Sequence, residues 1–270
     1  GHSVNSWSHM INHNSISEIK ALLDEHQISL KKRFGQNFLI DAGARRRIGA
    51  IVSDELELSS AAPGELWEIG PGIGSLTVEL LRLNRPLRLF EIDHGLVRVL
   101  RDQFGGAIAI EEGDFARTMG LHNDAAPVAI VGNLPYSSAS SMVARIIESA
   151  LTVPVMVFLV QAELADRLGA AVGGKDYSAL SVLAQSHYTV TSAFDIGGSS
   201  FYPRPRVGST VIIMRALSER PSRSVSRRTS QIARRAFGQR RKTLRNTLRP
   251  FLEALEAEGI DPGLRPEQLT

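Results

Sequence analysis

The chain has 270 residues, of which 43% are hydrophobic and 22% charged, and its formal net charge is only +3. This length allows one large α/β domain with a smaller appendage, and we expect residues 1–217 to form the first and residues 218–270 the second. No apolar run approaches the roughly 18 residues of a membrane span, and cysteine is absent, which excludes disulfides and thiolate metal sites and favours a cytoplasmic protein that holds no metal.

The predicted elements begin in the segment SISEIKALLDEHQISLKKRFGQNFLID, which predicts one amphipathic helix, then a basic loop, and then a second helix starting at Asp41. From Glu65 to about Val160, short aliphatic runs alternate with segments of helical period, which is the pattern of a doubly wound parallel sheet. We expect strands near residues 65–69, 87–92, 107–111, 128–132 and 153–160, with helices at 76–83, 96–104 and 142–150.

The following segments predict two more helices, QAELADRLGA and YSALSVLAQ, and then two strands, HYTVTSAFDI and VGSTVIIMRA. The loop GGSSFYPRPR joins these strands and has no helical period, which suits an antiparallel pair at the edge of the sheet. After Leu217 the polar stretch SERPSRSVSRRTS predicts a linker. Helical spacing resumes beyond it and is broken at Pro250 and Gly259.

A block of like charge lies between Arg220 and Arg249, where the chain has eleven Arg or Lys residues and no Asp or Glu. From Glu253 onward the chain is acidic. A block of this kind is either a solvated face or a surface that binds a polyanion.

The segment EIGPGIGSLT, at residues 68–77, follows the first strand of the sheet and opens a helix. In a doubly wound sheet ligands bind beyond the carboxyl ends of the strands, and Gly70, Gly72 and Gly74 would let a ligand approach the backbone. The loop departs from the G-x-G-x-x-G spacing of a pyrophosphate cradle. It therefore favours S-adenosylmethionine, which has no phosphate, over a dinucleotide such as NAD.

Acidic residues follow the next two strands. Glu91-Ile92-Asp93 lies about twenty residues beyond the glycines, where an acid can accept hydrogen bonds from both hydroxyls of a ribose. Asp114 follows the third strand and either accepts an adenine amino group or serves as a helix N-cap. Three glycine or acidic turns at successive strand ends favour the cofactor site.

The fourth strand leads into GNLPY, at residues 132–136. An adenine amino nitrogen is a poor nucleophile, because its lone pair is delocalised into the ring. If the Asn133 side-chain oxygen and the Leu134 carbonyl accept its two hydrogens, the nitrogen can pyramidalise and aim its lone pair at a methyl carbon without a strong base. Pro135 would rigidify this backbone, and Tyr136 would stack on a base extruded from its helix.

At this point the sequence resembles the ribosomal RNA adenine dimethyltransferases of the kasugamycin-sensitivity (KsgA) type. The resemblance runs from about Leu30 to Pro266 and rests on eight motifs in order: KKRFGQNFLID, EIGPGIGSLT, EID, GNLPY, VQAELADRL, DYSALSVLAQ, FYPRPRVGSTV and AFGQRRKTLRNTL. It implies an α/β, class I (Rossmann-like) methyltransferase fold with a small helical C-terminal domain. It also implies methyl transfer from S-adenosylmethionine to the N6 amines of two neighbouring adenosines near the end of small-subunit ribosomal RNA.

The resemblance also implies roles for individual residues. Phe201, in the F-x-P-x-P loop, looks like a second aromatic wall for the target adenine, although packing in the core or at a hinge would equally explain it. The residues that would contact the cofactor are Asn37, Leu39, Gly70, Gly72, Glu91, Asp114 and Asn133.

The same resemblance implies that the basic residues bind small-subunit ribosomal RNA in a pre-30S particle. A monomer is the simplest expectation for the oligomeric state. Folded RNA is held largely through its phosphates, so these side chains would supply salt-sensitive affinity. The expected RNA-binding residues are Lys31, Lys32 and Arg33 beside the mouth of the site, and Arg234, Arg235, Arg240, Arg241, Lys242 and Arg245 in the C-terminal part.

The chain departs from the family pattern at two places in the active-site region, and two other functions are possible interpretations of the sequence. After Tyr136 the family usually continues with Ile, Thr or Ser, and Pro, where this chain has SSASSM, and an acid commonly occupies the position of Gly208. The erythromycin-resistance (Erm) class performs the same chemistry on large-subunit RNA, but Leu134 and the block AFGQRRKTLRNTL argue against it. A ribosome-assembly factor that binds RNA with little catalysis is the other alternative, and the intact cofactor motifs argue against it.

Overall fold

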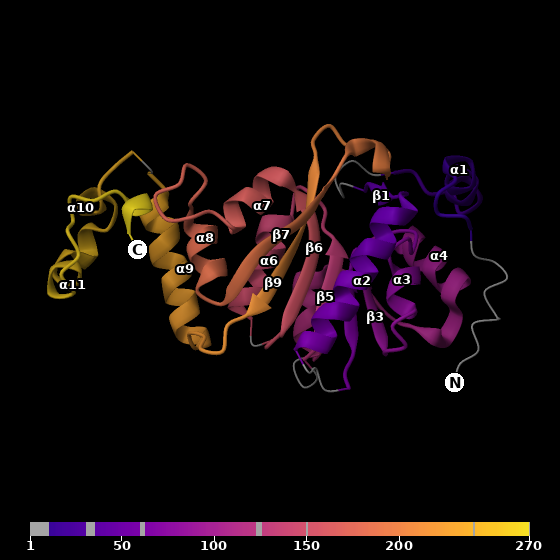
Figure 1. The fold of residues 1–270 in the computed structure, drawn as a ribbon, viewed down its shortest axis with the longest axis horizontal. Helices are drawn as coiled ribbons and strands as arrows, with labels where there is room; N and C mark the ends of the chain where they lie inside the picture. Colours follow the sequence, from indigo (N-terminus) through magenta and orange to yellow (C-terminus); the bar gives the residue numbers. More distant parts are fainter. Residues whose placement is uncertain are drawn as a thin grey trace.

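A computed structural model describes residues 11–30, 36–59, 63–122, 126–149, 151–239 and 241–269. Its centre is a seven-stranded sheet in the order β4-β3-β2-β5-β6-β9-β7 (Figure 1). The strands β2 to β6 run parallel, and β9 is antiparallel to both β6 and β7, so the predicted doubly wound sheet with an antiparallel pair at its edge is confirmed. The strands are β2 (Leu66–Ile69), β3 (Leu87–Glu91), β4 (Ala109–Glu112), β5 (Ala129–Asn133), β6 (Val155–Gln161), β7 (Tyr188–Ile196) and β9 (Ser209–Ala216).

Helices cover both faces of this sheet, because its parallel strands are apolar on both sides (Figure 1). On one face α2, α3 and α4 pack over a buried cluster that includes Val52, Leu80 and Leu100. On the other face α5 to α8 pack over a cluster that includes Trp67 and Val143. The helices are α2 (Ala42–Leu58), α3 (Thr77–Leu81), α4 (His94–Phe104), α5 (Phe115–Thr118), α6 (Ala139–Glu148), α7 (Ala162–Leu168) and α8 (Ala179–Gln185).

The strand order reverses at β2, which lies between β3 and β5. The chain proceeds from β2 outward to β4 and then returns to β5 on the other side of β2. In sheets of this kind the crevice at the reversal binds ligands. Gly70 follows β2 and Asn133 ends β5, so the two motifs singled out in the sequence meet at this crevice.

The N-terminal segment covers the same end of the sheet. α1 (Ile16–Glu25) packs Ile19 and Leu22 into a cluster with Ile73 of the glycine loop. The strand β1 (Phe38–Leu39) pairs with β8 (Phe201–Tyr202). The loop expected between the last two strands therefore contains a short strand, because it pairs with a segment far away in the sequence.

The prediction of a linker at residues 218–230 was wrong, because α9 (Arg223–Phe237) occupies most of this stretch. Ser222 is the N-cap of the helix, and its side chain accepts a hydrogen bond from the backbone of the first turn. The buried face includes Ser226 and Ser230, and the helix packs against α6 and α8. Small polar residues can face a helix interface closely, but they give no hydrophobic periodicity that would reveal the helix.

The remaining helices lie beyond α9, at the left end of Figure 1. Ala236, Leu244 and Leu248 form a small buried cluster there, separate from the two clusters of the sheet. Because α9 packs against both α8 and α10, the division of the chain after residue 217 stays a prediction. None of the helices in the described ranges is long and apolar enough to cross a membrane. The elements are α10 (Leu244–Thr247), a 3-10 turn (Arg249–Phe251), α11 (Leu252–Ala257) and a second 3-10 turn (Pro266–Gln268).

Candidate active site

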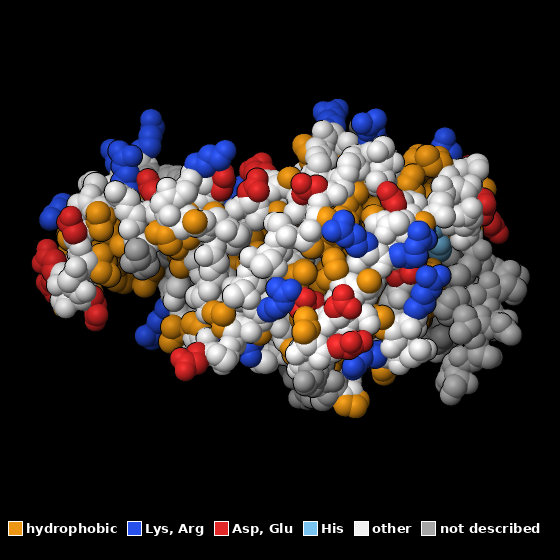
Figure 2. Space-filling view, in the orientation of Figure 1, with side chains coloured by type: hydrophobic (Ala, Val, Ile, Leu, Met, Phe, Trp, Pro, Cys, Tyr) orange, Lys and Arg blue, Asp and Glu red, His pale blue; other side chains and the backbone are white. Residues whose placement is uncertain are grey.

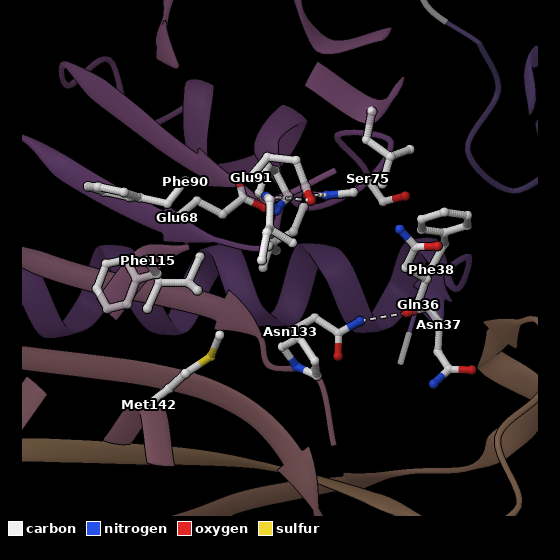
Figure 3. Close-up of a pocket in the computed structure, with 18 of the residues that line it drawn as sticks. Gln36, Asn37, Phe38, Glu68, Ser75, Phe90, Glu91, Phe115, Asn133 and Met142 are labelled. Carbon is white, nitrogen blue, oxygen red and sulfur yellow. Dashed lines mark hydrogen bonds between the residues drawn. The ribbon is translucent and has the colours of Figure 1, made fainter. Parts of the chain in front are cut away.

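A cavity lies beyond the carboxyl ends of β2 to β5 (Figure 3). Pro135 of GNLPY lines the cavity, whereas Leu134 is buried beneath it. The structure brings together all the residues expected at a cofactor, since the cavity is lined by Asn37, Leu39, Gly70, Gly72, Glu91, Asp114 and Asn133.

The glycine loop between β2 and α3 follows a path that few other residues can adopt. Gly70, Gly72 and Gly74 have φ angles of +64°, +62° and +84°. A Cβ atom at Gly74 would lie 2.5 Å from the ring of Phe104, so close packing against α4 adds to the requirement. The backbone of the loop lines the cavity directly, because Gly70 and Gly72 have no side chains to separate it from the cavity.

Glu91, the last residue of β3, is fixed by three backbone N–H groups. Its carboxylate accepts hydrogen bonds from Gly72 at 3.1 Å and from Ile92 and Asp93 at 2.9 Å. Burial raises the pKa of Glu91 to about 7, although these three bonds counteract the rise. The carboxylate of Asp93 instead caps α4, since it accepts a hydrogen bond of 2.8 Å from the backbone N–H of Gly95. Glu91, and not Asp93, therefore lines the cavity, and the bonds hold it at the cavity wall.

Three polar residues of the cavity, Gln36, Glu68 and Ser75, were not predicted. Glu68 in β2 is 1% exposed, its side chain accepts a hydrogen bond from Thr77, and burial raises its pKa to about 8. A charged residue in a strand buried on both faces is a sequence signal that could have identified it. Ser75 also lines the cavity, and its buried hydroxyl has no partner among the described residues. An unsatisfied hydroxyl at the wall of a cavity fits a polar ligand there.

Asp114 follows β4 and is the helix N-cap expected from the sequence, whereas its contact with an adenine amino group stays a prediction. One carboxylate oxygen accepts the N–H of Ala116 at 2.8 Å and caps α5, and the residue also lines the cavity. The cavity wall near it is apolar and includes Ile92, Phe115 and Met142 (Figure 3). This combination suits a flat heterocycle with an amino group at its edge. Met142 lies in α6, and no sequence motif indicates its place in the cavity.

Asn133 ends β5 beside the glycine loop. Its side-chain amide donates a hydrogen bond of 2.7 Å to the backbone carbonyl of Asn37 (Figure 3). Since a carbonyl only accepts, the NH2 group must face Asn37, and the side-chain oxygen is directed away from it. No described residue donates a hydrogen bond to that oxygen, which leaves it available as an acceptor. The strands β2 and β5 approach closely here, as shown by the distance of 2.7 Å between a Cβ atom built at Gly132 and the carbonyl oxygen of Ile69.

Tyr136 and Phe201, the two expected aromatic walls, differ in their surroundings. Tyr136 is half-buried and lines a small polar hollow between the first turns of α6 and α7. Phe201 is 3% exposed and belongs to the same buried cluster as Leu39, its partner in the pairing of β1 with β8. The structure therefore places Phe201 in the core, as the alternative of core packing expected, and its role as a wall for the adenine stays a prediction. Its ring is buried because β8 pairs with β1 and turns this face inward.

The basic residues of the C-terminal part fall into two groups. Arg234 pairs with Glu148 at 3.1 Å, and Arg235 donates to the carbonyl of Thr247. Figure 2 shows Lys and Arg side chains above the segment between α9 and α10, and acidic side chains gathered over α11. Among the expected RNA contacts, those that are exposed and form no ion pair with a described residue are Arg241, Lys242 and Arg245. Four expected RNA contacts, Lys31, Lys32, Arg33 and Arg240, lie outside the described residues.

A metal site has no support in the described part of the chain, where no cluster of three His, Asp or Glu residues occurs. The cavity is lined by hydrogen-bonding and apolar groups. Several of them, such as Glu91 and Asn133, lie at the ends of parallel strands. Such an arrangement can bind and orient an organic cofactor and a planar base beside it.

The sequence matches the family described as "Ribosomal RNA adenine dimethylase" over residues 27–265. It is 38% identical over 252 residues to the ribosomal RNA small subunit methyltransferase A of Pseudomonas aeruginosa, with 90% of this chain and 91% of that protein covered. It is 37% identical over 244 residues to the protein of the same name from Borreliella afzelii, with 90% and 83% covered.

Solved structures share the fold. A dimethyladenosine transferase from Plasmodium falciparum superposes with a TM-score of 0.65 at 22% identity, covering 82% of this chain and 90% of the other. The 23S rRNA methyltransferase ErmE superposes with a TM-score of 0.59 at 25% identity, covering 85% and 95%. The class I methyltransferase fold expected from the sequence is thereby confirmed.

Proposed function

Since this chain belongs to the ribosomal RNA adenine dimethylase family, we propose that it transfers methyl groups from S-adenosylmethionine to the N6 amines of two adjacent adenosines near the 3′ end of small-subunit ribosomal RNA. The observation that carries the proposal is the free side-chain oxygen of Asn133 at the rim of the cavity, fixed by the bond from its amide to Asn37. The choice of the small subunit is supported by relatives that carry this substrate in their names at 36–38% identity.

The cavity residues fit S-adenosylmethionine part by part. Glu91 would accept the ribose hydroxyls, and Asp114 would accept the adenine amino group, with the ring against Ile92 and Phe115. The backbone at Gly70 and Gly72 would accommodate the amino-acid end. When bound, this cofactor supplies an electrophilic methyl group on a positively charged sulfur.

The residues of GNLPY would act on the other reactant, the adenine amine. The Asn133 oxygen and the Leu134 carbonyl accept its two hydrogens, which localises the lone pair on nitrogen and directs it along the line of attack. These two acceptors would hold the nitrogen in place while it takes the methyl group that the cofactor would supply, and the proton that the alkylated amine then loses would pass to solvent. Neither acceptor needs to be a strong base, because the alkylated amine is acidic.

The RNA would be held mainly by charge. Arg241, Lys242 and Arg245 are exposed, and no described acidic residue pairs with them, so phosphates can take that place. The expected partner is a pre-30S particle, and the expected location is the cytoplasm, where bacterial ribosomal subunits assemble. A monomer remains the expected state.

The test is methyl transfer from labelled S-adenosylmethionine to two substrates, unmethylated small ribosomal subunits and protein-free large-subunit RNA. Nucleoside mass spectrometry of the product identifies the modified base. Dimethyladenosine in the small subunit alone is the expected result. Product in neither substrate, despite cofactor binding by calorimetry, would favour an assembly factor with little catalysis.

A second candidate is the Erm-type reaction on large-subunit RNA. The superposition with ErmE, at 25% identity over 85% of this chain, favours keeping it as an alternative. Product in large-subunit RNA alone would establish it and refute the small-subunit assignment.

A further inference from the structure

Tyr136 is tethered by its hydroxyl group to a residue 73 positions further along the chain. The phenolic oxygen lies 2.5 Å from the hydroxyl of Ser209, and either group can be the donor. Ser209 is 1% exposed, so water cannot replace this contact readily. A hydrogen bond between two buried or half-buried hydroxyl groups is costly to lose, since each is then left unsatisfied.

Ser209 is held far more rigidly than Tyr136. It is the first residue of β9 and pairs with Gln161 at the end of β6 and with Ile196 at the end of β7. Strands therefore fix its backbone on both sides. Tyr136 instead lies in the connection between β5 and α6, where no ladder holds the backbone. Ser209, which the strands hold, thus determines where the ring of Tyr136 points.

The hollow that Tyr136 lines has walls of mixed character. Ala139 and Ser140 of the SSASSM segment have small side chains, and Leu164 of α7 is the larger apolar neighbour. The remaining lining residues, Gln161, Glu163 and Arg167, are polar. Such packing does not fix the direction of the phenolic oxygen, whereas the hydrogen bond to Ser209 does.

We propose that Ser209 is a positioning residue for methyl transfer, because it holds the Tyr136 ring in the orientation needed to stack on the extruded adenine. The proposal rests on the function proposed above, in which Tyr136 contacts the base. The affinity for RNA comes mainly from phosphates, so a freed ring should reduce the fraction of bound substrate whose adenine is placed for reaction. The loss should therefore appear in kcat, with KM for RNA and affinity for the cofactor little changed.

The first experiment is a double-mutant cycle with Ser209→Ala, Tyr136→Phe and the double variant. Each single variant should lower kcat on the RNA that the wild-type protein methylates by about three- to tenfold. The double variant should be no worse than the more affected single, because both changes remove the same bond. Effects that multiply, or wild-type kcat in Ser209→Ala, would overturn the proposal.

Thr210→Val is the matched control. Thr210 is the next residue of β9 and is also buried, but its hydroxyl donates to Asp195 at 2.7 Å and not to the active site. This variant should keep kcat close to that of the wild type, even if its free energy of unfolding falls. A loss of kcat equal to that in Ser209→Ala would mean that any buried hydroxyl in β9 has this effect.

Nuclear magnetic resonance of protein with labelled tyrosine rings tests the tether without any activity. The chain has four tyrosines, so the signals can be assigned by substitution. Ser209→Ala should change the shift and increase the mobility of the Tyr136 ring, and leave Tyr177, Tyr188 and Tyr202 unchanged. An unaltered Tyr136 signal in Ser209→Ala would overturn the tether. If the ring becomes mobile in Ser209→Ala but the wild-type protein methylates neither substrate, the tether stands and the proposed function fails.

Discussion

The cofactor cavity and the basic C-terminal surface present their functional groups in opposite ways. In the cavity Glu91 accepts three backbone hydrogen bonds and Asn133 is oriented by Asn37, all at the ends of parallel strands. On the C-terminal surface the side chains of Arg241 and Arg245 are exposed and form no ion pair with a described residue. Chemistry on an amine requires groups fixed to within a fraction of an ångström, whereas attraction of phosphates requires only a density of charge.

The comparison predicts that changes in the cavity act strongly and through geometry, and that changes on the surface act weakly and through charge. The strongest test is Asn133→Ala, which removes the acceptor for the adenine amine. We expect kcat to fall by about 100-fold or more, as when one preorganised polar group of a reaction site is removed. Binding of S-adenosylmethionine should remain measurable by calorimetry. Unchanged methylation in single-turnover assays would show that another group positions the amine.

A second test concerns the close approach of β2 and β5 that brings the cavity walls together. In Gly132→Ala the new Cβ atom would lie 2.7 Å from the carbonyl oxygen of Ile69, so the strands must separate. We expect the free energy of unfolding to fall by about 1–3 kcal/mol, measured by urea denaturation. Gly208→Ala is the control, since nothing lies within 4 Å of a Cβ atom there. Equal stability of the two variants would mean that the crevice is not tightly packed.

A third test uses the pKa of Glu91, which burial raises to about 7. Ribose hydroxyls donate to the ionised carboxylate, so cofactor binding favours the deprotonated form and becomes weaker as the pH falls through this pKa. Between pH 8 and pH 6 the ionised fraction falls about tenfold, and the affinity for S-adenosylmethionine should fall by about the same factor. Calorimetry over this range is the measurement. Glu91→Gln should bind more weakly and lose this part of the pH dependence, and an identical pH profile in both proteins would contradict the assignment.

Much of the cavity was predictable, because each strand of a parallel sheet ends at the same edge. A motif with Gly, Glu, Asp or Asn directly after an apolar run therefore identifies a side chain at that edge, and Gly70, Glu91, Asp114 and Asn133 all lie there. Met142 could not be predicted in this way, since it enters the cavity from a helix. Its place depends on how α6 packs, and no local pattern encodes that.

One wrong prediction and one residue with two interpretations have a common physical origin. The start of α9 was predicted as a linker because its buried face contains Ser226 and Ser230, which give no apolar stripe. For Phe201 the resemblance left two interpretations, a wall for the adenine and packing in the core. No local pattern showed that β8 pairs with β1, 162 positions away, and buries the ring. Hydrophobic periodicity reports burial within one element. It does not report contacts that a distant element creates.

The smallest expected effect is on the C-terminal surface, and its test is Arg241→Glu. Reversal of one exposed charge should weaken binding of small-subunit RNA by about fivefold at low salt and reduce the slope of log K against log salt by about 1. Arg241→Lys keeps the charge and should bind almost as the wild type does. A loss of the same size in both variants, or one independent of salt, would indicate a specific geometric contact. The surface would then resemble the cavity, and the contrast between the two regions would be refuted.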